Sequence, residues 1–234
     1  MSDQIDFERA WLSKLSQALD ELAGRDVRAV VMDGSEGLSS ASPRDDVIAW
    51  TRGALERLGA QVDEETEQRI LTRCACQYPP ADLQEVRRRY RETKDVRIAH
   101  QMLQDRFERF LRDTLQLEET LVEDVVTRGW GLAGVLEAGR IVATKIPKSG
   151  CLRAYLAEED LARRRALYCH CPRIRDVLLS GETLPKAYCA CGAGFYQGIW
   201  EEITQAPVEV EVLESVLAGG EVCRIGIYIR RRRE

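Results

Sequence analysis

Hydrophobic residues recur at helical spacing through most of the first half of the chain. Between residues 6 and 23, Trp11, Leu15 and Leu19 fall on one side of a helix, and Gly24 follows as a stop signal. The Val-rich run 26–33 does not indicate one type of element, and the residues over 34–42 are mostly small and polar, which is typical of a loop. The pattern predicts further helices over 43–58, 63–73, 81–93, 95–115 and 118–126.

After residue 131 the spacing changes and strands enter the pattern. Alternating hydrophobic residues over 134–137 and 140–146, around an Ala138-Gly139 turn, predict one β-hairpin, and 208–212 with 222–229 predict a second. Helical spacing returns over 151–168, 172–180 and 192–206. We therefore predict an α+β fold, with a helical N-terminal layer over 1–130 packed on a mixed C-terminal ligand-binding-like domain over 131–234.

Composition and charge narrow the class of protein. The chain has 234 residues with 34 Lys and Arg against 39 Asp and Glu, so its net charge of −5 gives no overall basic field for nucleic acid. We expect no nucleic-acid partner, and we expect the short basic run Arg230–Arg233 to be a solvated end. We also expect no membrane partner and a cytoplasmic location, since no apolar run approaches about 20 residues and the start lacks a signal-peptide pattern.

Cysteine spacing is the main chemical signal. Six of the 8 cysteines form three Cys-x-Cys pairs: Cys74 with Cys76, Cys169 with Cys171, and Cys189 with Cys191. In a reducing compartment these should be thiols or metal ligands rather than disulfides. Side chains two positions apart point in different directions in a helix or a strand, so both sulfurs of a pair can hold one ion only where the backbone turns. Each of the three pairs falls at the boundary of a predicted element.

The chemistry of these thiols suits a soft metal. Two pairs supply the four sulfur ligands of a tetrahedral zinc site, and six thiolates with His170 could hold two metals or an iron–sulfur cluster. Cys171 and Cys191 begin predicted helices, where the helix dipole lowers a thiol pKa. Cys223 shares strand parity with buried isoleucines, so we assign it, like Cys151, to a structural role.

Other residues are candidates for a small-molecule pocket near the thiols. Lys145 and Lys148 could recognise an anion at a strand end, and three aromatic residues could line the pocket: Tyr188, Tyr196 and Trp200. The glycines at 192, 194 and 198 resemble a phosphate cradle, but without a preceding strand they favour close backbone packing.

The C-terminal half also carries a resemblance. From Tyr188 to Tyr196, over 200–204 and 208–211, and from Glu221 to Ile225, the chain resembles an uncharacterised prokaryotic family of cysteine-rich proteins. Over 131–229 it more distantly resembles the ligand-binding 4-vinyl reductase domain and the aminothiazoline-carboxylate hydrolase family, through the motif Gly220-Glu-Val-Cys223. That resemblance implies a mixed α/β domain, small hydrophobic or heterocyclic ligands, and a site role for Cys223 that conflicts with its strand parity.

Three functional hypotheses follow. The first is a protein that binds zinc or an iron–sulfur cluster beside a small-molecule pocket, with metal-assisted hydrolysis if a coordination position is open. The second is a thiol-redox sensor or regulatory interaction protein, and the third is a metal-free small-molecule-binding domain.

Overall fold

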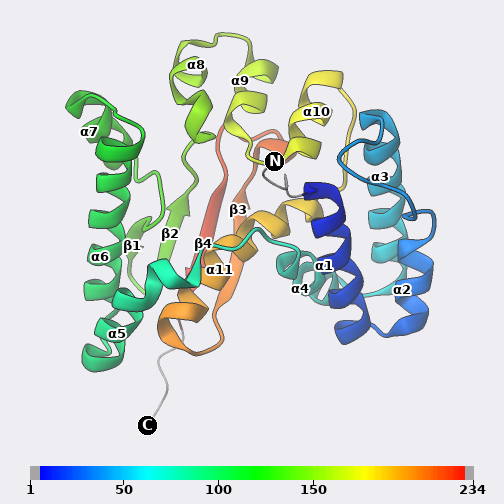
Figure 1. The fold of residues 1–234 in the computed structure, drawn as a ribbon, viewed down its shortest axis with the longest axis horizontal. Coiled ribbons are helices and arrows are strands. Elements are labelled where there is room, and N and C mark those ends of the chain that lie inside the picture. Colours follow the sequence, from blue (N-terminus) through cyan, green and yellow to red (C-terminus); the bar gives the residue numbers. More distant parts are fainter. Residues whose placement is uncertain (1–5, 230–234) are drawn as a thin grey trace, which may run out of the picture.

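The computed structural model describes residues 6–229, so the Arg230–Arg233 run lies outside it. These residues form helices around one four-stranded antiparallel sheet, which confirms the α+β class (Figure 1). The first half contains α1 (Phe7–Leu22), α2 (Arg25–Met32), α3 (Arg44–Gln61), α4 (Glu64–Arg73), α5 (Gln84–Thr93), α6 (Val96–Arg109) and α7 (Glu119–Thr127). The second half contains β1 (Val135–Glu137), β2 (Arg140–Thr144), α8 (Leu152–Ala157), α9 (Leu161–Tyr168), α10 (Pro172–Ser180), α11 (Ala190–Thr204), β3 (Glu209–Glu214) and β4 (Arg224–Tyr228).

Side-chain caps fix several helix starts. The carboxylates of Asp6, Asp63 and Asp160 accept hydrogen bonds from backbone N–H groups in the first turns of α1, α4 and α9. The cap at Asp160 divides the single helix expected over 151–168 into α8 and α9, because 158–160 leave the helical conformation. The undecided run 26–33 forms the short helix α2.

Other boundaries differ from the sequence prediction by a few residues. The helix expected to stop at Gly59 runs to Gln61, and the long helix over 95–115 ends at Arg109 before a π-helical turn over Phe110–Thr114. Both hairpins are present, although a 3-10 turn over Val216–Ala218 lies between β3 and β4.

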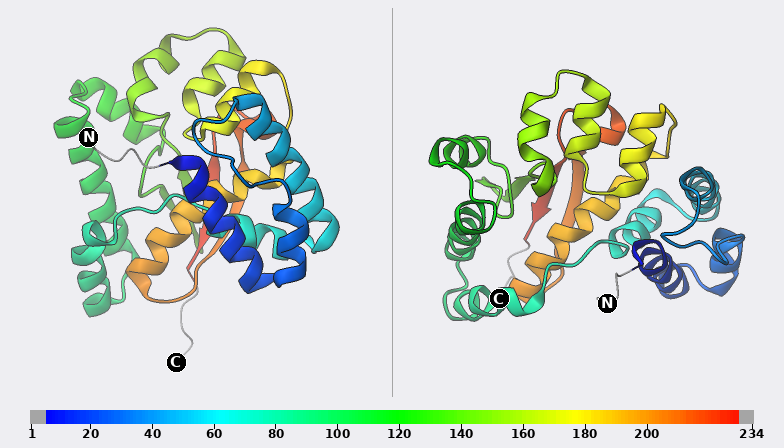
Figure 2. Two further views of the ribbon diagram at one scale, coloured as in Figure 1. Left: turned by 45° about the vertical axis from the view of Figure 1, so that its right-hand side comes forward. Right: turned by 45° about the horizontal axis from the view of Figure 1, so that its top comes forward.

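The two hairpins join into one sheet of order β1-β2-β4-β3, because β2 and β4 pair antiparallel, with Ala143 opposite Ile225. In Figure 1, α5–α7 lie on one side of the molecule and α1–α3 on the other, with the sheet between them and α8–α10 across one end. Helix α11 runs beside the sheet, in contact with β3, β4, α4 and α5 (Figure 2). Its position places its N-terminus near the centre of the molecule.

Two hydrophobic cores hold these layers together. One contains α1 and parts of α3 and α4 with residues such as Tyr168 and Tyr188, and the other lies between α11 and the sheet, around Trp200 and Ile227. Each core combines side chains from before and after residue 130, so the two halves share their hydrophobic interior. The division of the chain into a helical region over 1–130 and a ligand-binding-like domain over 131–234 stays a prediction.

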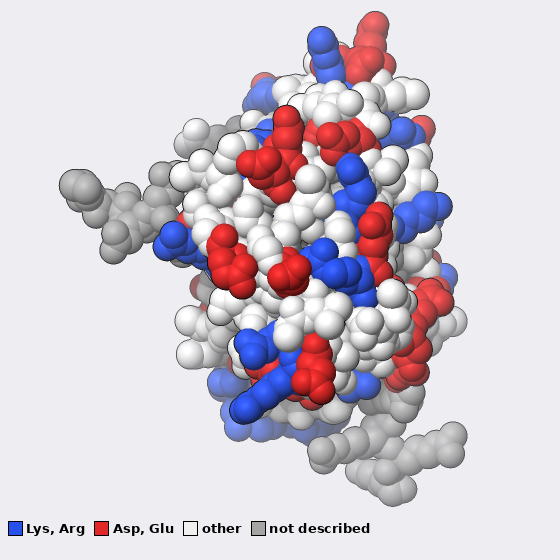
Figure 3. All heavy atoms as spheres, turned by 90° about the vertical axis from the view of Figure 1, so that its right-hand side faces the viewer, with Lys and Arg blue, Asp and Glu red and all other residues white. Residues whose placement is uncertain are grey.

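The surface over α2 and α3 carries acidic and basic side chains interspersed with one another (Figure 3). Within the described part of the chain, the helices are all too short or too polar to cross a membrane.

Candidate functional site

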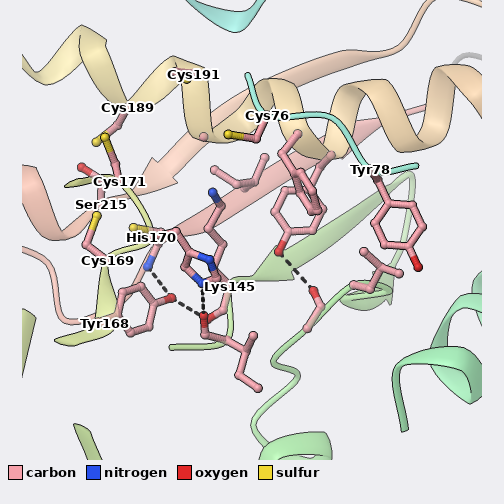
Figure 4. Close-up of a pocket in the computed structure, with 18 of the residues that line it drawn as sticks. Cys76, Tyr78, Lys145, Tyr168, Cys169, His170, Cys171, Cys189, Cys191 and Ser215 are labelled. Carbon is pink, nitrogen blue, oxygen red and sulfur yellow. Dashed lines mark hydrogen bonds between the residues drawn. The ribbon is translucent and has the colours of Figure 1, made fainter. Parts of the chain in front are cut away.

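A pocket of about 1000 Å³ lies between the sheet, the N-terminus of α11 and the segments that flank α9 and α10 (Figure 4). Its lining is mainly apolar and aromatic, and it also includes six charged side chains: Asp82, Arg106, Arg109, Asp113, Lys145 and Glu214. Six of the eight cysteines border it, and they come from segments far apart in the sequence: Cys76, Cys169, Cys171, Cys189, Cys191 and Cys223.

The cysteine pairs lie at element boundaries, as their spacing predicts. Cys169 ends α9 and Cys171 directly precedes α10, while Cys189 directly precedes α11 and Cys191 lies in its first turn. These turns let both members of each C-terminal pair face the same pocket. Local turns therefore orient the two thiols of each pair, and the packing of the α9–α10 corner beside the start of α11 brings the four thiols to one cavity.

Cys74 differs from the other predicted metal ligands. It is 1% exposed in the hydrophobic core behind the pocket, and its thiol donates to the carbonyl oxygen of Ile70 at 3.4 Å. Its partner Cys76 is exposed at the pocket. The first pair is thus divided between core and pocket, and Cys74 is not among the residues that line the cavity.

Burial dominates the acidity of the pocket thiols. Burial first, and then a neighbouring thiolate at Cys223 or Cys171 respectively, raises the pKa of Cys189 and of Cys191 to about 12. The expected lowering at the α11 N-terminus is therefore wrong for Cys191, since desolvation outweighs the helix dipole. Burial also raises the pKa of Cys169 and of Cys223.

A buried polar network holds one edge of the pocket. Arg173, which is 1% exposed, forms an ion pair with Glu8 and donates to the hydroxyl oxygen of Tyr188 at 3.1 Å. That hydroxyl lies 3.2 Å from the sulfur of Cys171. Because burial raises the pKa of Tyr188, the hydroxyl keeps its proton while its oxygen accepts from Arg173, and either this hydroxyl or the Cys171 thiol donates the hydrogen bond between the two.

His170 and Tyr168 fix the adjacent backbone. His170 Nε2 lies 2.8 Å from the carbonyl oxygen of Ile146, which can only accept, so Nε2 carries the proton. The His170 side chain is accessible from the pocket. The surrounding protein nevertheless desolvates its charged form, which lowers the pKa of His170 and keeps the ring neutral at pH 7. Tyr168 donates to the carbonyl oxygen of Lys145 at 2.6 Å and accepts from the backbone N–H of Cys223 at 2.9 Å.

The five predicted ligand-binding residues separate into two groups. Lys145, Tyr188 and Tyr196 line the pocket, and the Tyr196 hydroxyl donates to the carbonyl oxygen of Gly131 at 3.1 Å. Lys148 and Trp200 lie elsewhere: Lys148 is outside the lining, and Trp200 is completely buried in the core between α11 and the sheet.

Sequence reasoning missed two parts of the pocket. Cys223 precedes β4 and borders the cavity instead of serving only the core, and the Gly220-Glu-Val-Cys223 motif was the signal that pointed to it. The aromatic side chains Tyr78, Phe107 and Phe195 also line the cavity. Phe107 lies in a predicted helix and Tyr78 between two predicted helices, and neither position gave a sign of a ligand site.

The thiols do not form a ready-made metal centre. Among residues 6–229, no group of three or more His, Cys, Asp or Glu side chains lies in an arrangement that could hold a metal ion. A metal would have to draw the thiols together and displace their protons.

The fold and the pocket define an α+β protein with a thiol-lined apolar cavity. Residues 154–233 match the model of a family of unknown function, DUF6144. The matched region carries five of the six pocket cysteines, all except Cys76. No curated protein and no solved structure matches the chain.

Proposed function

We propose that the protein binds a small, mainly apolar molecule in the thiol-lined pocket. The observation that carries the proposal is the cavity itself: about 1000 Å³, bordered by aromatic and aliphatic side chains with a few polar groups among them. Ligand pockets in proteins have volumes of roughly 300–1,000 Å³ and this kind of lining.

The chemistry of the lining supports an apolar ligand. The raised pKa values of Cys189 and Cys191 keep these thiols neutral at pH 7, and a neutral thiol behaves as a small, polarisable apolar group. The neutral ring of His170 adds no charge. At the thiol end of the pocket, a ligand would therefore exchange water for contacts with neutral thiols and aromatic rings.

The test is binding of phenylnaphthylamine, a neutral dye whose fluorescence rises in apolar surroundings. We expect saturable binding at one site. Leu132 lines the pocket, so Leu132→Trp should fill part of the cavity and weaken binding at least about fivefold, in line with roughly 1 kcal/mol of lost contact.

The matched control is Leu179→Trp, because Leu179 is 59% exposed and lies outside the pocket. This variant should bind the dye as the wild type does. A folded wild-type protein that binds no dye, or equal weakening by both variants, would contradict the proposal.

A second candidate function is soft-metal binding at the thiol end of the same pocket. The observation that favours it is that four cysteines border the same part of the pocket: Cys169, Cys171, Cys189 and Cys223. Burial is the main cause of the raised pKa of Cys169, and a thiolate at any of the other three positions would also raise that pKa. Four cysteine thiols are a donor set for zinc or an iron–sulfur cluster, and such a cation would draw them together and replace their protons.

Metal content tests this second candidate. Protein purified without oxygen or chelator should contain stoichiometric zinc or iron, which Cys169→Ser/Cys171→Ser should lose. Cys151 is a cysteine outside the pocket, so Cys151→Ser should retain the metal. Absence of metal from the folded wild type, or equal content in all three proteins, would rule the candidate out.

A further inference from the structure

We propose that the pocket selects molecules that carry one acidic group, a carboxylate or a sulfonate, on an apolar ring body, and that Lys145 binds the acidic group. This inference rests on the proposed function and adds the chemical class of the ligand. Four observations carry it: the fixed backbone of Lys145, the place of its ammonium group, the lack of a carboxylate partner, and the aromatic lining beside it.

The backbone of Lys145 is held on both sides. Its N–H donates to the carbonyl oxygen of Cys223 at 3.0 Å, which extends the pairing of β2 with β4 by one residue, and its carbonyl oxygen accepts from the Tyr168 hydroxyl. These contacts fix the direction in which the side chain leaves the sheet. The side chain enters the pocket (Figure 4).

The ammonium group lies against the start of α11. A Cβ placed on Gly192 would lie 3.2 Å from Lys145 Nζ, so the missing side chain at this position leaves room for the ammonium. Nζ also lies 5.8 Å from the centre of the Phe195 ring. The cation is thus inside the cavity, next to an aromatic surface.

Lys145 forms no ion pair with any residue in the described range 6–229. Three other charged groups of the pocket have partners: Arg106 pairs with Asp82 at 3.0 Å, and Glu214 accepts from the backbone N–H of Glu221 at 3.0 Å. Arg109 and Asp113 also border the pocket, and Arg109 donates to the carbonyl oxygen of Asp105 at 3.4 Å. An anionic ligand would therefore meet a cation that has no internal competitor.

The neighbouring thiols do not neutralise this charge. Cys189 and Cys191 stay protonated at pH 7, and Lys145 opposes the rise of their pKa without overcoming burial. A partly buried ammonium without a counter-charge favours binding of an anion, because a charge-assisted hydrogen bond is stronger than a neutral one.

The apolar body of the ligand has a surface beside the cation. Phe195 packs edge-on against Tyr78 with ring centres 6.3 Å apart, and Phe107 borders the same cavity. In Figure 4, Lys145 lies between the cysteine end of the pocket and Tyr78. A ring system placed against Tyr78 and Phe195 brings an attached acidic group within reach of Nζ.

The experiment compares two dyes with the same aromatic skeleton. Anilinonaphthalene sulfonate carries an acidic group, whereas phenylnaphthylamine is neutral. Lys145→Met removes the charge and keeps an apolar stem, so it should weaken sulfonate binding about tenfold or more and leave binding of the neutral dye unchanged.

Lys148 provides the matched control, because it has the same charge and lies three positions later, outside the pocket. Lys148→Met should change neither affinity. Lys145→Gln serves as a second uncharged variant, and thermal unfolding confirms that each variant is folded.

The outcomes separate the two levels of the argument. Equal sulfonate affinity in the wild type and in folded Lys145 variants, with the neutral dye still bound, overturns the inference and leaves the proposed function standing. A folded wild type that binds neither dye overturns both. An equal loss in Lys145→Met and Lys148→Met also overturns the inference, since it indicates general surface charge.

Discussion

Six cysteines line one pocket, and their surroundings give them different chemistry. Cys76 is exposed, whereas burial holds the pKa of Cys189 and of Cys191 near 12. At pH 8 a thiol with a pKa of about 12 is ionised in roughly one molecule in ten thousand. Thiolate is the reactive form, so the pocket protects these two residues from mild electrophiles.

Alkylation by iodoacetamide, followed by mass spectrometry, measures this difference. We expect Cys76 to react first at pH 8, and Cys189 and Cys191 to react far more slowly, with rates that rise about tenfold per pH unit up to pH 11. Reaction of Cys191 as fast as Cys76 at pH 8 in the folded protein would contradict the assigned burial.

The Glu8 carboxylate, with 2% of its side chain exposed, balances Arg173 and also accepts from Arg44 at 2.8 Å. Removal of one partner of a buried pair leaves an uncompensated charge, so Glu8→Gln should lower the free energy of unfolding by about 3–5 kcal/mol in urea titration. The control is Glu21→Gln, which breaks an exposed pair with Arg73 and should cost less than about 1 kcal/mol. Equal costs would show that the network does not stabilise the fold.

At the scale of elements, α11 connects the sheet, α4 and the pocket. Its three glycines have different surroundings. A Cβ on Gly194 would lie 1.9 Å from the carbonyl oxygen of Thr72, at the end of α4, whereas nothing lies within 4 Å of a Cβ on Gly198. Close backbone packing therefore explains Gly194, as the sequence analysis expected, and does not explain Gly198.

These two glycines make a matched pair of substitutions in one helix. Gly194→Ala forces the backbone of α4 and α11 apart, so we expect it to destabilise the protein by about 1–3 kcal/mol or more. Gly198→Ala meets open space and improves helix propensity, so it should stabilise by up to about 1 kcal/mol. Thermal unfolding measures both, and a shift of the same sign in both variants would contradict the packing described here.

Local signals predicted the elements that place the thiols, and long-range packing determined the rest of the pocket. The corner positions of Cys171 and Cys189 follow from Pro172 and from the glycines after Cys191, which are readable in the sequence. The aromatic lining from Tyr78 and Phe107 depends on how the segment after α4 and the helix α6 pack near the sheet, which helical spacing does not specify. Strand parity placed Cys223, just before β4, on the same side as Ile225 and Ile227, but it could not show that a cavity lies at that end of the strand.

The acidity of Cys191 shows the same limit. Its place at a helix start is visible in the sequence, whereas its desolvation requires the packed structure. The dipole argument gave a lowered pKa because the competing effect of burial, which is larger, could not be estimated from the chain alone.

At the scale of the whole molecule, the raised thiol pKa values link stability to alkaline pH. The thiol pKa is about 12 for Cys189 and for Cys191 in the folded protein, against an ordinary value of 9.0. Above pH 9 the unfolded chain loses these protons while the folded protein keeps them. The stabilising contribution is therefore complete below about pH 9 and is lost as the pH rises toward 12.

We expect the free energy of unfolding to fall between pH 9 and 11, and to fall less steeply in Cys189→Ser/Cys191→Ser. Each removed thiol should flatten the slope by up to about 1.4 kcal/mol per pH unit. Urea titration at a series of pH values in a reducing buffer measures the slopes. Identical slopes in the two proteins would contradict the assigned pKa values.

The central claim, that the thiol-lined cavity is a ligand site, is tested most directly by a crystal structure with a brominated naphthalene sulfonate. We expect an anomalous bromine peak inside the cavity, with the ring against Tyr78 and Phe195 and the sulfonate at Lys145 Nζ. A peak only on the outer surface, or an empty cavity at a concentration that saturates dye fluorescence, would contradict it.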